Sequence, residues 1–155
     1  MFAHHIWATR RLIDHLGAVA SERLQESVPG TYGSILATLG HLLAADDRYL
    51  LRLYDAHLPA AGPDQVRSLG ELRDELDDHE RRWGRALAEL ERGELHAQIR
   101  GRADYPDLED ATGMLLLQAI HHGNDHRTQV CTTLGALGED VPDLDGWMYW
   151  VDGRT

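Results

Sequence analysis

The sequence predicts an all-α protein, a four-helix bundle with one long crossover connection. Four blocks of residues carry apolar side chains at helical spacing, and glycine and proline residues separate these blocks. Strand-like alternation is confined to short pieces within residues 94–108. The 155 residues are one domain's length and can bury a core without disulfides, so we expect a single domain over residues 1–155.

The first two predicted helices are separated by the pair Pro29-Gly30. The first covers residues 2–21, and the second runs from Ser34, a candidate N-cap, to about His57, ahead of two prolines. Both have apolar side chains at the spacing of one helix face: Phe2, Ile6, Ile13, Leu16 and Ala20 in the first, and Ile35, Leu39, Leu42, Leu50 and Leu53 in the second.

The third predicted helix begins at Ser68, which forms a capping box with Glu71, and ends at Gly93. Residues 94–108 then form a long connection, in which we expect a little strand. Because this connection is long for simple neighbours, it favours a crossover topology over plain up-down-up-down. The apolar positions of the third helix are Leu69, Leu72, Leu76, Trp83, Leu87 and Leu90.

The fourth predicted helix starts at Leu108 or Glu109 and runs to Leu137, with Gly138 as the C′ residue. Residues 141–150 follow as a tail with three large aromatic side chains, too apolar to lie free in water. Two interpretations stay open: the tail covers the bundle's own core, or it contributes to a homodimer.

The acidic composition limits the possible partners. The formal net charge is -11 and no basic cluster offsets it, so we expect neither a nucleic-acid nor a membrane partner. All basic side chains other than histidine are arginines, which excludes Schiff-base chemistry by a lysine. The single cysteine, Cys131, excludes an internal disulfide, and neither a signal peptide nor a membrane-spanning run is evident. These features predict a cytoplasmic protein.

His122 and His126 are the most informative residues for function. Residues four apart share one helix face, so both imidazoles can reach the same ion, and both lie beside the aliphatic stripe of the fourth helix. A nitrogen or carboxylate from a neighbouring helix would complete a site with an open position. His41, in the second helix, is the natural third candidate, while His121 points away and is expected at the surface or behind the ligands.

A structural interpretation of these histidines competes with the metal site. A pair four residues apart also arises by chance among ten histidines, and a lone His41 is more often a hydrogen-bonded core residue. Inward-facing ionisable rings need partners, however, and one bound metal would satisfy several of them. Small residues around His41, including Thr38, also leave room for a cavity or a close helix.

Four motifs support a specific family resemblance. The segment 33–42 and the pattern His122-x-x-x-His126-Arg127-x-Gln129 resemble the paired signatures of the DinB-like (damage-inducible) metalloprotein superfamily. Phe2-x-x-x-x-Trp7-Ala8 is similar to that family's first-helix pattern, and Pro142-x-Leu144-Asp145-x-Trp147-x-Tyr149 to its closing segment. The resemblance covers nearly the whole chain. Two residues depart from the family's patterns: Thr9 stands where the first helix often has Asn, and Thr128 replaces the Gly commonly found between Arg and Gln. Both bear on details of the pocket rather than on the histidines.

The resemblance implies an up-down-down-up bundle that holds a divalent metal, zinc or nickel most often, on His41, His122 and His126. It also implies a homodimer. Characterised branches of the family include mycothiol-dependent maleylpyruvate isomerases and bacillithiol transferases, which use a low-molecular-weight thiol as the nucleophile. A small-molecule thiol or electrophile is therefore an expected partner.

Three neutral ligands leave a divalent ion positively charged and open to a further ligand. Such an ion would hold a thiol as thiolate for attack on an electrophile, or activate water for hydrolysis. The expected activity is thus a metal-dependent thiol S-transferase or hydrolase. The alternative is a non-catalytic, stress-associated dimer in which the metal only stabilises the bundle. A di-iron carboxylate bundle is rejected because no Glu-x-x-His motif occurs.

Residues near the histidines receive separate predictions. Thr38 and Gln129 are pocket candidates, and Gln129 could instead orient a ligand ring. Arg127 is expected to pair with an acidic residue on another helix. Cys131, five residues past His126, is expected to be a small buried hydrophobe rather than a nucleophile.

Overall fold

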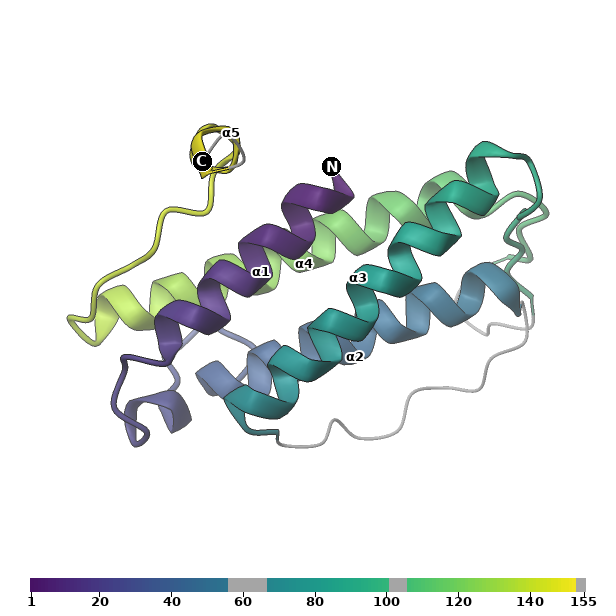
Figure 1. Ribbon diagram of the computed structural model, residues 1–155. Helices are drawn as coiled ribbons and strands as arrows, with labels where there is room; N and C mark the ends of the chain where they lie inside the picture. Colours follow the sequence, from purple (N-terminus) through teal and green to yellow (C-terminus); the bar gives the residue numbers. More distant parts are fainter. Residues whose placement is uncertain (56–66, 101–105, 153–155) are drawn as a thin grey trace.

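The computed structural model describes residues 1–55, 67–100 and 106–152, and these residues form an elongated bundle (Figure 1). Its elements are α1 (Phe2–Leu16), a short 3-10 helix η1 (Arg23–Gln25), α2 (Ile35–Tyr54), α3 (Leu69–Glu91), α4 (Thr112–Ala136) and α5 (Gly146–Asp152). The prediction of an all-α fold with four long helices is confirmed. An isolated antiparallel bridge between Ile99 and Leu108 is the counterpart of the strand expected in the connection.

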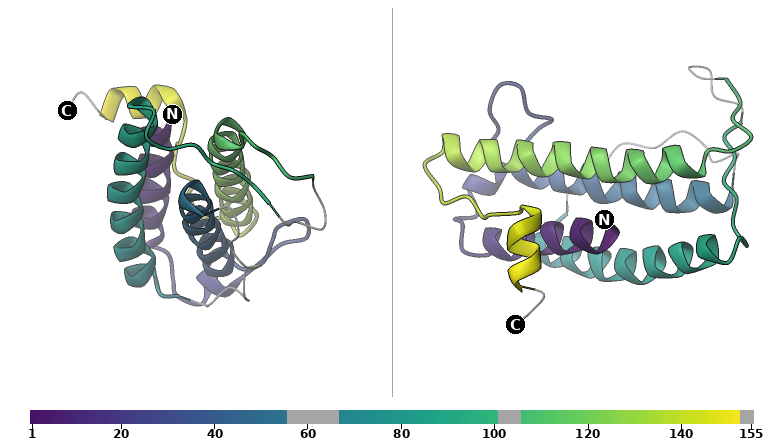
Figure 2. Two further views of the ribbon diagram at one scale, coloured as in Figure 1. Left: turned by 90° about the vertical axis from the view of Figure 1, so that its right-hand side faces the viewer. Right: turned by 90° about the horizontal axis from the view of Figure 1, so that it is seen from above.

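The four long helices have the up-down-down-up topology. Helices α1 and α4 run in one direction along the bundle, and α2 and α3 run in the other (Figures 1 and 2). Helix α2 packs against both α3 and α4, and α1 packs against the same two helices on the opposite side. The pairs α1/α2 and α3/α4 therefore lie diagonally across the bundle.

The position of the crossover differs from the prediction. Helix α3 ends and helix α4 begins at the same end of the bundle, so the connection predicted to cross, residues 94–108, is no crossover (Figure 1). The consecutive helices that run parallel are α2 and α3: α2 ends at Tyr54 at one end of the bundle, and α3 begins at Leu69 at the other. The described parts of the connection between α3 and α4 meet in the Ile99–Leu108 bridge.

Two helix boundaries also differ from the prediction. Helix α1 ends at Leu16, because the chain turns at Gly17 and then buries Leu24 of η1 against the core. Helix α4 begins at Thr112, since Leu108 pairs with Ile99 through two backbone hydrogen bonds of 2.9 and 2.8 Å. The predicted end of the second helix at His57 lies outside the described residues.

The predicted caps are present where the chain is described. Ser34 accepts from the backbone N–H of Ala37 at 3.2 Å and begins α2. Ser68 and Glu71 form the capping box of α3. Gly138 follows α4 with φ of 75°, a conformation in which glycine avoids the steric cost of a side chain.

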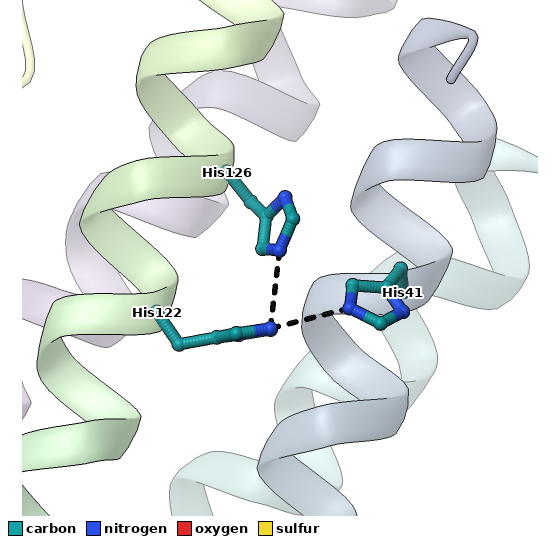
Figure 3. A group of neighbouring side chains, drawn as sticks. All are labelled: His41, His122 and His126. Carbon is teal, nitrogen blue, oxygen red and sulfur yellow. Dashed lines mark hydrogen bonds between the residues drawn. The ribbon is translucent and has the colours of Figure 1, made fainter. Parts of the chain in front are cut away.

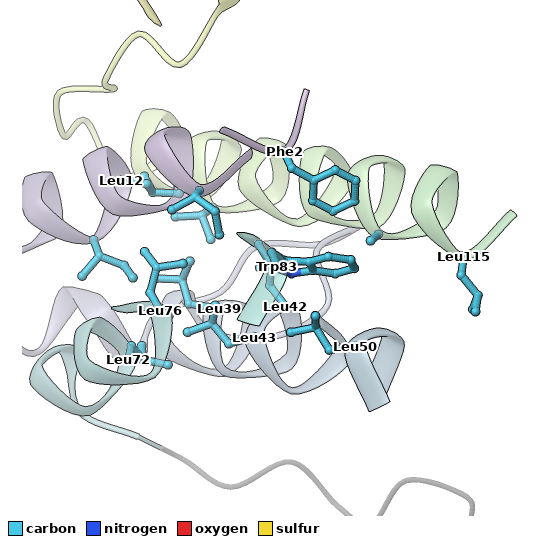
Figure 4. Packing of buried hydrophobic residues seen from close by; sticks show 14 of the residues in the cluster. Phe2, Leu12, Leu39, Leu42, Leu43, Leu50, Leu72, Leu76, Trp83 and Leu115 are labelled. Carbon is cyan, nitrogen blue, oxygen red and sulfur yellow. The ribbon is translucent and has the colours of Figure 1, made fainter. Parts of the chain in front are cut away.

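Aliphatic side chains from all four long helices fill the core (Figure 4). Trp83 of α3 is 1% exposed, and its ring lies 4.3 Å from that of Phe2 in α1. The aromatic pair ties the start of α1 to the middle of α3. The largest fully buried aliphatic side chains are Leu12, Leu16, Ile35, Leu39, Leu42, Leu43, Leu50, Leu53, Leu72, Leu76 and Leu134.

The aromatic tail is only partly covered by its own bundle. Tyr149 of α5 packs its ring edge-on against His4 and Trp7 of α1, with centroids 5.6 and 5.4 Å away. Trp147 is 82% exposed and Trp150 is 59% exposed. One aromatic ring therefore anchors α5 on α1, while the two tryptophans present apolar surface to the outside.

Candidate metal centre

Helices α2 and α4 bring the three predicted histidines together (Figure 3). His122 Nε2 lies 3.2 Å from His41 Nε2 and 3.1 Å from His126 Nε2. One nitrogen of each ring lies within 4.8 Å of the other two. The α2/α4 contact thus joins a residue of one helix to a pair four residues apart on the other.

The spacing of these nitrogens fits a small cation. Two nitrogens bound tetrahedrally at about 2.0 to 2.1 Å from zinc lie about 3.3 Å apart, close to the 3.2 and 3.1 Å that separate Nε2 of His122 from the other two rings. Without an ion, the two contacts of His122 are in conflict. The Nε2 atom of His122 faces two other nitrogens, and one lone pair or one N–H group cannot satisfy both contacts. A cation between them would remove this conflict.

The environment keeps His122 in the form that a metal requires. Burial, followed by the neighbouring rings of His126 and His41, lowers the pKa of His122 from 6.5 to about 4. The ring is therefore neutral at physiological pH, with a lone pair available for a metal. Its other nitrogen, Nδ1, is buried without a hydrogen-bond partner among the described residues.

Two tyrosines that sequence reasoning did not select form the walls of the centre. The ring of Tyr32 stacks on His41 at 4.0 Å and lies edge-on to His126 at 5.5 Å. The ring of Tyr49 lies edge-on to His122 at 5.8 Å. Tyr32 sits in the turn before α2, outside the helical spacing of any predicted helix, so no local signal pointed to it.

Gln129 contacts one of the three histidines directly. Its Oε1 atom lies 3.2 Å from Nδ1 of His126 and accepts from the backbone N–H of Tyr32 at 2.9 Å. The hydroxyl of Thr38 is buried and donates to the carbonyl of Gly33 at 3.4 Å, which supports the turn that carries Tyr32. A direct role of Thr38 in lining the pocket stays a prediction.

A buried polar network lies behind the centre and connects α1, α2 and α4. Nε2 of His5 donates to Asp46 at 2.6 Å, and Arg127 donates to Nδ1 of His5 at 3.2 Å and to the hydroxyl of Thr9 at 2.9 Å. All four side chains are at most 3% exposed. Burial lowers the pKa of Arg127 to about 10, so it stays charged at neutral pH.

The expected pairing of Arg127 with an acidic residue on another helix is not found among the described residues, where its guanidinium donates to His5, Thr9 and Asn124 instead. Arg127 reaches Asp46 through the ring of His5, and its other terminal nitrogen donates to Asn124 at 2.5 Å. Asp46 was not selected from the sequence, but a signal existed. It lies four residues after Leu42 and four before Leu50, so a carboxylate interrupts an apolar stripe.

The other predicted neighbours lie outside the group of three. Cys131 is half-buried, and burial raises the pKa of its thiol, which disfavours the thiolate. It lines a cavity of about 340 Å³ between α4 and the segment 141–145. His121 is exposed and lies 3.2 Å from Asp125, one turn along α4.

Comparison with protein families gives a match that covers almost the whole chain. The profile described as the DinB family matches residues 1–152. Neither the curated proteins nor the solved structures show a significant match to the chain. Within residues 1–55, 67–100 and 106–152, none of the helices has the length and apolar character needed to cross a bilayer.

Proposed function

The chain belongs to the DinB family, and from that premise and the convergence of its histidines we propose that it is a metal-dependent enzyme. In this proposal His41, His122 and His126 hold one divalent ion, zinc or nickel. The reaction is transfer of a low-molecular-weight thiol to an electrophile, or hydrolysis by water at the same position. The observation that carries the proposal is the meeting of three Nε2 atoms between α2 and α4.

The donor set favours a catalytic over a purely structural ion. Structural zinc sites are normally closed by four protein ligands, whereas catalytic sites keep a position for substrate. Among the described residues, the group that can hold an ion contains three histidines and no cysteine or carboxylate. Three neutral rings would also leave the full positive charge of a divalent ion available to an incoming anion.

When bound, the ion would supply the charge that lowers the pKa of a thiol or of water. In the transferase reaction, the thiolate sulfur forms a bond to the electrophilic carbon, and the leaving group departs with its bonding electron pair. The protein's own part is to hold three imidazoles close together and to keep that of His122 neutral. His41 and His122 are half-buried, so the centre is within reach of small molecules.

Metal content of tag-free protein tests the ligand assignment. We expect close to one equivalent of metal in the wild type, and loss of it in His41→Ala and His122→Ala variants that circular dichroism shows to be folded. His121→Ala is the matched control, because this histidine is adjacent to His122 but exposed and directed to Asp125. It should keep the metal.

The outcomes separate the possible functions. Metal that disappears in both folded ligand variants supports the centre, and thiol-dependent consumption of a chromogenic electrophile then tests the transferase reaction. Absence of metal from the wild type after incubation with zinc or nickel would contradict the proposal.

A second candidate function is a non-catalytic, stress-associated homodimer in which the ion stabilises the bundle. The exposed α5 favours a dimer, because Trp147 and Trp150 place large apolar area at the surface. A dimer is equally compatible with an enzyme, so thiol-dependent turnover, rather than oligomeric state, distinguishes the two functions.

A further inference from the structure

A single oxygen atom joins the histidine group to the turn that precedes α2. Oε1 of Gln129 lies 2.9 Å from the backbone nitrogen of Tyr32 and 3.2 Å from Nδ1 of His126. Gln129 belongs to α4, one turn past His126, whereas Tyr32 is 97 residues away in the chain. The two contacts therefore link segments that share no local structure.

The backbone contact decides how the Gln129 amide is oriented. A backbone N–H group can only donate, so the atom of Gln129 that faces Tyr32 must be the oxygen. The same oxygen faces Nδ1 of His126, which must then carry the proton of the ring. Its Nε2 atom is left with a lone pair directed at His122, as a metal ligand requires.

The backbone contact also holds the Tyr32 ring in place. That ring stacks on His41 and meets His126 edge-on, so it covers one side of the histidine group while remaining 51% exposed itself. Thr31 secures the same turn by donating to the carbonyl of Val28 at 2.8 Å. A change at Gln129 would thus alter both the tautomer of His126 and the cover over His41.

We propose that Gln129 is a positioning residue that couples metal binding to the placement of Tyr32. By accepting from both partners, it selects the metal-binding tautomer of His126 and holds Tyr32 over one side of the centre. Because a coupling between two events is reciprocal, metal binding in turn stabilises the Tyr32 turn. This inference rests on the proposed metal centre.

Three substitutions of Gln129 test the role of its oxygen. Gln129→Glu keeps an acceptor at the same length, Gln129→Leu removes it at similar size, and Gln129→Asn withdraws it by one methylene. We expect Gln129→Leu to weaken zinc binding by about 10- to 100-fold, the usual effect of losing a hydrogen-bond partner of a ligand. Gln129→Glu should bind zinc as well as the wild type. Gln98→Leu, in the connection after α3, is the control for a glutamine-to-leucine change.

Two spectroscopic readouts distinguish positioning from a merely structural role. Nitrogen NMR of the metal-free protein should show His126 protonated at Nδ1 in the wild type and Gln129→Glu, and a mixture of tautomers in Gln129→Leu. Amide hydrogen exchange at Tyr32 should slow when zinc is added to the wild type. In Gln129→Leu this exchange should be faster and insensitive to zinc.

Each result has a distinct meaning. Wild-type tautomer and zinc affinity in folded Gln129→Leu would overturn the inference while leaving the metal centre intact, as would Tyr32 exchange that ignores zinc in the wild type. A wild type that binds no zinc contradicts the proposed function and, with it, the coupling. If Gln129→Leu does not fold, Gln129→Asn provides the same comparison.

Discussion

Gly123 in the middle of α4 allows His5 of α1 to approach the helix backbone closely. A β-carbon at this position would lie 2.3 Å from Cε1 and 2.6 Å from Nδ1 of His5. The ring has no room to retreat, because it is buried and hydrogen-bonded to Asp46 on one side and to Arg127 on the other. We therefore expect Gly123→Ala to destabilise the fold.

The magnitude follows from two opposing contributions. Displacing His5 disturbs two buried hydrogen bonds, and each polar group left unsatisfied costs about 1 to 3 kcal/mol. Alanine is better than glycine inside a helix by about 1 kcal/mol. The net loss is about 3 kcal/mol, which lowers the melting temperature of a protein of this size by about 6 to 12 °C.

Thermal unfolding followed by circular dichroism measures this effect, and Gly84→Ala is the matched control. Gly84 lies inside α3, is exposed, and a β-carbon there meets no atom within 4 Å. The control should gain about 1 kcal/mol from helix propensity alone. The packing argument fails if Gly123→Ala melts at or above the wild-type temperature.

Two further predictions concern α3 and α5. His79 is 1% exposed, and burial lowers the pKa of its ring, although Asp46 and Asp47 act in the opposite direction. As the pH falls, this histidine therefore takes up a proton in the unfolded chain at a higher pH than in the folded protein. Stability should decline as the pH drops below about 6.5, and urea titrations at several pH values should show a smaller decline for His79→Leu; an unchanged slope would contradict this. If α5 forms the dimer contact, sedimentation should show Trp147→Ser dissociating at a concentration at least about tenfold higher than the wild type. Leu117→Ser, which changes another exposed apolar side chain but on α4, should leave the dissociation concentration unchanged. Weaker association of Leu117→Ser, with no change in Trp147→Ser, would instead place the dimer interface on α4.

The candidate site was predictable to the extent that its residues follow helical spacing. His122 and His126 share a face because they are four apart, and His41 of another predicted helix was the natural third candidate before the resemblance implied the same three residues. Tyr32 and Tyr49 were not predictable in this way. Their contacts with the histidines depend on how α2 and the turn before it pack against α4. The spacing of residues within one helix gives no information about that packing.

Buried polar residues show the same limit. Asp46 stands in a leucine stripe of α2, so its burial could have been inferred, but its partner His5 belongs to a helix diagonally across the bundle. From the sequence alone, Gly123 is expected to weaken α4, because glycine has a low helix propensity. Its role becomes evident only when the ring of His5 is placed against it. Pairings between distant helices require the packing to be known.

The helices, their caps and the inward direction of most apolar side chains follow from local sequence, because hydrogen bonds and apolar spacing within one segment are sufficient to specify them. The route of the crossover does not. A long connection can join diagonal helices or opposite ends of the bundle, and residues 94–108 and the chain between Tyr54 and Leu69 satisfy the length requirement alike. Which one crosses depends on which helix faces bury most area against each other, and that is a property of the assembled bundle.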